Sequence, residues 1–104
     1  MEKEDNSIQR NEDYGFFYYL LGHDDHLYKQ TVSAMKHYAI AWGFFRLNED
    51  KVVMDSIDRI LRTSIDDWKQ LEQVHDYGYM VAQKSCMVDN LINSLLGKKS
   101  VYIY

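Results

Sequence analysis

Four consecutive residues, His23-Asp24-Asp25-His26, are the first on the chain whose side chains could do chemistry. Imidazole nitrogens and carboxylate oxygens can bind zinc, manganese or iron, and the same groups can exchange protons with a substrate. The spacing does not match the known helical metal sites. Neither His-Glu-x-x-His nor a pair of Glu-x-x-His segments occurs in the chain.

A structural role explains the same four residues. Gly22 can end one helix, Asp24 or Asp25 can cap the next, and the second carboxylate then favours the positive end of that helix. We therefore predict a helix start at this segment. A metal-dependent enzyme that uses the four side chains is the alternative.

The other reactive side chains are isolated in the sequence. His75 lies on an apolar stripe, where we expect a hydrogen-bonded residue at the edge of the core. Cys86 is the only cysteine, so no disulfide can form within the chain, and only Lys84 is a basic neighbour. No Ser-His-Asp or Cys-His arrangement follows from the spacing, and there is no glycine-rich phosphate loop. We predict no enzyme activity, no catalytic residue, no cofactor and no metal.

The composition is that of an ordinary globular protein. The 104 residues suit one domain, 46% of them are hydrophobic and 27% are charged, and no proline interrupts long helices. The formal net charge is −4, and the first thirteen residues, with five acidic and two basic side chains, carry −3 of it. The rest of the chain is nearly neutral, which argues against a broad nucleic-acid surface.

The sequence also leads to an expected location. It opens with MEKEDNSIQRNEDY, which lacks the basic start and apolar centre of a signal peptide. The longest unbroken apolar run, residues 16–21, is too short to span a bilayer. We therefore expect a cytoplasmic protein that makes no membrane contact.

Helical spacing of apolar residues dominates the first half of the chain. Residues 12–21 are rich in aromatics and suit a short helix capped by Asn11, although a buried strand has the same composition. The next helix is expected from about His26 to Leu47. Its second half is apolar nearly all round, so another element must cover it.

The clearest stripe follows, after a turn in which Asn48 is expected to cap the next helix. Most of its members lie three, four or seven residues apart. They are Val53, Ile57, Ile60, Leu61, Ser64, Trp68, Leu71 and His75. Residues 63–66 have the composition of a capping box, but the stripe keeps its phase across them. This predicts one continuous helix over residues 49–75.

Two glycines delimit the last predicted helix. Gly78 is expected to end the preceding helix in a left-handed conformation, and Gly97 to end the last one, over residues 79–96. The stripe of this helix, expected to face the core, is Val81, Val88, Leu91, Ile92 and Leu95. The final SVYIY alternates and is prone to extended structure.

These elements predict an all-α fold. Short connections favour an antiparallel up-down helical bundle of three long helices plus a short N-terminal helix. The expected organisation is a flexible acidic tail over residues 1–11, a helical domain over 12–97 and an extended C-terminal tail over 98–104.

A binding function is expected, because aromatic residues exceed what a three-helix core needs and no reactive centre is evident. The prediction is a non-enzymatic module that contacts a protein partner stoichiometrically, as inhibitors, immunity proteins, antitoxins and phage-type accessory regulators do. A homo-oligomer is expected too, with a dimer favoured. The residues expected at the partner interface are His37, Ile40, Phe44, Leu47, Tyr102 and Tyr104.

The alternative function belongs to another class. A pocket between helices, lined by tyrosines, could hold a small ligand or nucleotide. The residues expected there are Tyr38, His75 and Lys84.

Overall fold

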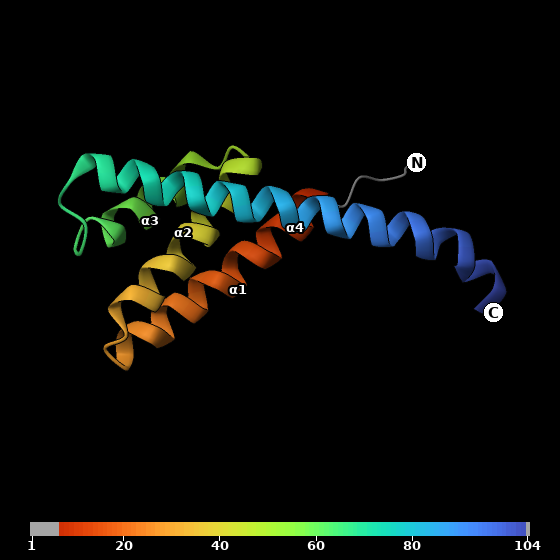
Figure 1. Cartoon of the computed structure of the whole chain (residues 1–104), viewed down its shortest axis with the longest axis horizontal. Coiled ribbons are helices and arrows are strands. Elements are labelled where there is room, and N and C mark those ends of the chain that lie inside the picture. Colours follow the sequence, from red (N-terminus) through yellow and green to blue (C-terminus); the bar gives the residue numbers. More distant parts are fainter. Residues whose placement is uncertain (1–6, 104) are drawn as a thin grey trace.

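The computed structural model describes the backbone of residues 7–103 and the side chains of residues 7–96. Four helices follow one another in this part of the chain, with no strand among them (Figure 1). They are α1 (Ser7–Leu27), α2 (Thr31–Leu47), α3 (Lys51–Leu61) and α4 (Trp68–Ile103). The predicted all-α helical bundle is confirmed.

Helix α1 is longer than the short helix predicted for the N-terminal segment. It starts before Asn11 and continues through Gly22, which packs against the ring of Tyr38 instead of ending the helix. The histidine–aspartate segment therefore lies in the last turns of α1. The predicted helix start at that segment is wrong.

The connections on either side of α2 are tight turns of the same kind. The amide of Gln30 donates to the Asp25 carbonyl at 2.8 Å, and the amide of Asp50 donates to the Phe45 carbonyl at 3.0 Å. Lys29 and Glu49 take the left-handed conformation that such helix ends require, with φ of 59° and 56°. The turns make α1 and α2 an antiparallel pair and lead directly into α3.

The cap of α3 is not the predicted one. Asp50 caps this helix by accepting a hydrogen bond from the Val53 amide at 3.3 Å. Asn48 instead forms the C-cap of α2.

The predicted continuous helix over residues 49–75 is wrong, because α3 ends at Leu61 and α4 begins at Trp68. The Thr63 hydroxyl donates to the Ile60 carbonyl, and the Asp67 carboxylate accepts from the Lys69 amide at 2.9 Å. Such side chains compete with helical hydrogen bonds and break the helix. Ile57, Leu61 and Leu71 of the predicted stripe enter one core cluster, whereas Ser64 and Trp68, the stripe members at the break, are exposed.

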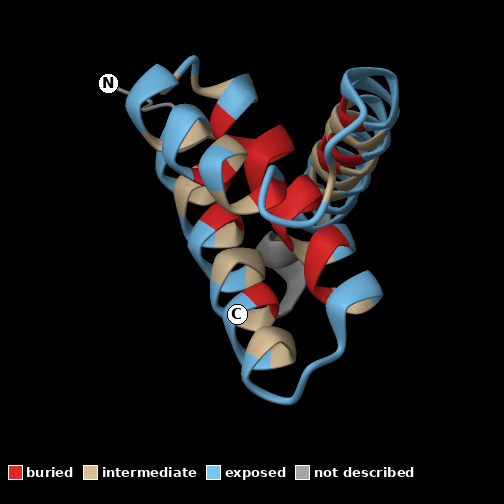
Figure 2. Cartoon of the chain, turned by 90° about the vertical axis from the view of Figure 1, so that its left-hand side faces the viewer, coloured by how far each residue is buried: buried red, intermediate tan, exposed pale blue. Residues whose placement is uncertain are grey.

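Helix α2 is the centre of the molecule and packs against each of the other three helices. Nearly every residue from Ala34 to Phe45 is buried, as the apolar second half of this helix predicts. Buried positions lie between the helices and exposed positions lie outside (Figure 2). One side of α2 packs with α3 and α4 around Trp42, and another packs under α1 around Phe44.

The crossing of α2 and α4 brings two backbones into direct contact. A Cβ atom on Gly43 would lie 2.3 Å from the Gly78 carbonyl oxygen, and one on Gly78 would lie 1.8 Å from the Ala39 carbonyl oxygen. Gly78 is buried inside α4, and no described glycine has a positive φ. The predicted left-handed cap at Gly78 is therefore wrong, and the glycine serves close helix packing.

The end of the chain also differs from its prediction. Helix α4 continues through Gly97 to Ile103, so the predicted helix end and most of the expected extended tail fall within a helical backbone. Tyr104 lies outside the described residues.

We expect Gly78→Ala to lower the free energy of unfolding by about 1–3 kcal/mol, since the added methyl meets backbone that must move. Helix propensity alone would predict that Gly78→Ala raises the free energy of unfolding, because alanine has a higher intrinsic helix propensity than glycine. Urea denaturation measures the change. Gly22→Ala is the matched comparison, because its Cβ would meet a side chain, the Tyr38 ring at 2.9 Å, and not the backbone of another helix. Equal stability of wild type and Gly78→Ala would contradict the close crossing.

Candidate interaction surface

The histidine–aspartate segment is occupied by contacts within the chain. Asp25 accepts hydrogen bonds from the Ser33 hydroxyl at 2.8 Å and from His37 Nδ1 at 2.6 Å. The ring of His26 lies against Tyr38, with centroids 5.3 Å apart, while His23 and Asp24 are exposed. Among the described residues, no three His, Cys, Asp or Glu side chains gather closely enough to hold a metal ion. The segment ties the end of α1 to α2.

The fold changes the pKa of the Asp25 carboxyl. The hydrogen bond from Ser33, and then the one from His37, lowers the pKa of Asp25 below its ordinary value of 3.8. A carboxyl with a lowered folded-state pKa stabilises the fold above its unfolded pKa. That contribution disappears as the pH falls through the folded value.

We predict that Asp25→Asn lowers the free energy of unfolding near neutral pH, because the ionised acceptor is lost. The difference from wild type should shrink as the pH falls below about 4, where the unfolded-state carboxyl protonates. Urea denaturation across a pH series measures it. The exposed neighbour provides the control, since Asp24→Asn should show no comparable trend. A pH-independent difference for Asp25→Asn would contradict the role of its charge.

His75 makes the hydrogen bond expected at the edge of the core. Its Nε2 lies 2.5 Å from Asp58 Oδ1, which joins α4 to α3. Its ring stacks on Trp42 of α2, with centroids 3.9 Å apart and planes 8° apart. The histidine therefore holds three helices together.

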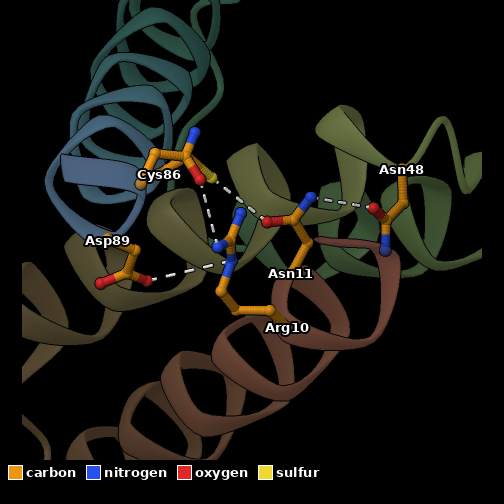
Figure 3. A network of polar contacts seen from close by, with 6 residues as sticks. Arg10, Asn11, Asn48, Cys86 and Asp89 are labelled. Carbon is orange, nitrogen blue, oxygen red and sulfur yellow. Dashed lines mark hydrogen bonds and ion pairs between the residues drawn. The ribbon is translucent and has the colours of Figure 1, made fainter. Parts of the chain in front are cut away.

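A polar network around Asn11 joins α1, α2 and α4 (Figure 3). Asn11 is only 6% exposed; it donates to Asn48 Oδ1 at 3.0 Å and accepts from the Cys86 thiol at 3.2 Å. Asn48 in turn donates to the Ile8 carbonyl at 2.9 Å. The sequence indicated only a helix cap for Asn11, because its partners lie 37 and 75 residues away.

Asp89 extends this network along α4. The guanidinium of Arg10 lies 3.9 Å from Asp89, and the Tyr14 hydroxyl interacts with the same carboxylate. Hydrogen bonding to Asp89, followed by burial, raises the pKa of Tyr14 above its ordinary value of 10.0. The Asp89 carboxylate is thus a polar link between Tyr14 of α1 and helix α4.

We expect Asn11→Ala to destabilise the fold by about 1–3 kcal/mol, since the half-buried partners Asn48 and Cys86 lose their hydrogen bonds. Asn90→Ala is the matched control. This exposed amide accepts one long hydrogen bond from Arg10, at 3.4 Å, and its loss should cost less than about 0.5 kcal/mol. Thermal or urea unfolding compares the two. Equal losses would contradict a special role for the buried amide.

The predicted partner interface is largely covered by the chain itself. Phe44 and Ile40 are buried; the rings of Tyr14 and Tyr18 stack on Phe44 with centroids 5.2 and 5.9 Å away. Leu47 is half-buried against the same cluster, and His37 is half-buried in its contact with Asp25. The side chains of Tyr102 and Tyr104 lie outside the described part. A partner cannot reach Ile40 and Phe44, because both are buried. They belong to the core, and their prediction as interface residues is wrong.

The predicted tyrosine-lined pocket does not form either. Tyr38 is buried against Tyr19 and His26, His75 stacks on Trp42, and Lys84 is exposed on α4. Each of the three residues has a different environment.

An apolar groove is present elsewhere. It has a volume of about 400 Å³ and lies between the start of α2, the loop before α4, and α4 itself. Its apolar lining includes Met35, Ile65, Val74 and Tyr77. Sequence reasoning missed this groove, because the loop that closes it was predicted to be helix.

Exposed apolar side chains gather on the outer side of α1. We call this surface the α1 outer face: Phe16, Phe17, Leu20 and Leu27, exposed by 49, 54, 63 and 67%. Asp13 and Asp24 are exposed on the same side of the helix and add negative charge next to these apolar residues. The inner side of α1 packs on α2 through Tyr14, Tyr18 and Gly22. Helix α1 is therefore apolar on two sides, and the residues that the structure describes cover only one of them.

A second exposed surface lies on α4. The stripe predicted to face the core packs only at its start, and the rest is exposed. We call this part the α4 stripe: Val88, Leu91, Ile92 and Leu95, exposed by 52, 60, 44 and 54%. The side of α4 that packs on α2 carries Gly78 and Ala82. The expectation that the stripe faces the core is wrong beyond Val81.

Comparisons with protein-family models, with curated proteins and with solved structures each found no match to this chain. Within the described part, none of the helices combines the length and the hydropathy needed to cross a lipid bilayer.

Proposed function

We propose that this protein is a non-enzymatic helical module that binds another protein by stoichiometric contact through the α1 outer face. The observation that carries this proposal is an exposed group of two phenylalanines and two leucines beside acidic side chains. Aromatic anchors with a polar rim are the composition of protein–protein contact sites. A partner that presents an apolar groove with basic residues at its edge fits this face.

The internal contacts support a binding role over a catalytic one. His26, His37 and His75 each lie against a neighbouring aromatic ring or carboxylate, and Asp25 and Asp58 hold two of these histidines. These side chains act between helices of the chain. In the proposed function the helices serve as a rigid support for the outer face of α1.

The kinds of protein that act in this way are inhibitors, immunity proteins, antitoxins and phage-type accessory regulators. Each works by occupying a surface of its target, and none needs a reactive centre. A cytoplasmic target is part of the proposal. A surface with exposed Asp13 and Asp24 is poorly suited to nucleic acid, because phosphates and carboxylates repel one another.

Affinity purification of the tagged full chain from its native host tests the proposal. We expect one protein at a stoichiometric level, and we expect Leu20→Asp to weaken its binding at least tenfold in a titration with the purified partner. Leu91→Asp is the matched control, since Leu91 has a similar exposure, 60% against 63%. The absence of any partner, or equal weakening by the two variants, would contradict the proposal.

The apolar groove favours a second candidate function, the binding of a small apolar ligand. Its apolar lining includes Met35, Ile65, Val74 and Tyr77, and Lys36 is the one charged residue in the lining. Thermal-shift screening with metabolites and nucleotides tests this candidate. Val74→Lys should abolish any shift that arises in the groove.

A further inference from the structure

The α4 stripe is an exposed apolar surface over which no described side chain packs. All six residues from Leu91 to Leu96 are exposed, and helix α4 runs on beyond the other three helices (Figure 1). Val88, Leu91, Ile92 and Leu95 lie three, four or seven apart, which places them on one side of the helix. Met87 and Leu96, exposed by 69 and 51%, flank them.

A helical segment of this kind needs a covering element. An isolated helix of this length is marginal in water, and helices in proteins gain most of their stability by packing an apolar side. None of the described side chains covers this part of α4. A partner outside the described residues would complete the packing of the stripe.

Spacing and charge favour a second copy of the same segment as that partner. Apolar residues that alternate three and four apart are the spacing by which two helices pair side by side. Asp89 is the one charged residue from Val88 to Leu96, and it lies against Arg10 of α1, so the uncharged stripes of two copies can meet without repulsion. The α1 outer face differs, because its acidic border would repel a second copy of itself.

The available area agrees with a dimer. Six aliphatic side chains that are about half exposed offer on the order of 500 Å² of apolar surface per copy. The polar residues on both flanks of the stripe add to it. The total approaches the roughly 800 Å² per partner that a stable interface buries.

The position of helices α1, α2 and α3, which form the body of the protein, favours one direction of pairing. The first half of α4 lies across the side of the body formed by α1, α2 and α3, where it packs on α2, and the second half projects beyond them (Figure 1). An antiparallel pair places the two bodies at opposite ends of the interface, where they do not collide. It also brings the opposite ends of the two helix dipoles together.

We propose that the α4 stripe is a homodimer interface in which two copies of the chain pair antiparallel through Val88, Leu91, Ile92 and Leu95. This inference goes beyond the proposed function, because it concerns a different surface and a different partner. The dimer would present two copies of the α1 outer face at its two ends.

Analytical ultracentrifugation of the purified full chain tests the interface. Wild type should sediment at twice the chain mass at micromolar concentration. Leu91→Asp and Leu95→Asp should each weaken dimerisation at least tenfold, because the charge enters the apolar contact. Leu20→Asp is the control and should leave the dimer intact. Circular dichroism of Leu91→Asp and Leu95→Asp should show at most the loss of helix in the projecting part of α4, since the substituted side chains lie outside the core.

Distance measurement between spin labels tests the direction. Gln70→Cys in a Cys86→Ser background places a single label on the exposed start of α4. An antiparallel dimer centred near Asn90 separates the two labels by about 60 Å at 1.5 Å per residue. A parallel dimer would bring them within roughly 20 Å, because paired helices lie about 10 Å apart.

Three outcomes would overturn this inference: a monomeric wild type at 100 µM or about that concentration, a dimer that persists in Leu91→Asp, or a short distance between the labels. None of them bears on the α1 outer face. If the wild type is a monomer and Leu20→Asp still weakens binding of the host partner, the proposed function stands and only the dimer is rejected.

Discussion

The contact on which the structure depends is the crossing of α2 and α4, where Gly43 and Gly78 allow two helix backbones to touch. A side chain at either position would overlap a carbonyl group of the other helix. Helices usually cross at 8–10 Å, and the smallest residues give the closest approach. Because α4 lies so near, α2 becomes the axis of the molecule, and α1 and α3 pack on the sides of it that remain.

This arrangement determines where apolar surface is left over. The second half of α2 is covered on nearly every side, so the neighbouring helices bury only the sides that reach it. Among the described residues, nothing packs over the outer face of α1 or over the α4 stripe. In a chain of this size such surface suits contact with other proteins. The two surfaces differ in character, since one is aromatic with an acidic border and the other is aliphatic and uncharged.

The residues with reactive side chains serve mainly to join helices. Asp25 binds His37 across the first turn, Asp58 lies against His75, and Cys86 donates to Asn11. Partly buried polar groups need such partners, because an unpaired group would destabilise the fold. The role of His75 could be expected from its place on an apolar stripe. The roles of Asn11 and Cys86 could not, because contacts over 75 residues leave no local signal.

The sequence by itself determined that the chain is helical, since the absence of proline and the spacing of apolar residues leave few alternatives. It also identified the apolar second half of α2 as a segment that must be covered. Only the tertiary structure decided that Gly22 and Gly78 lie inside helices, that residues 62–67 break one, and that the α4 stripe is exposed. The reason is physical. A glycine that ends a helix and a glycine that admits a neighbouring backbone are the same residue, and a periodic stripe shows which side chains share a side without showing whether another helix lies opposite.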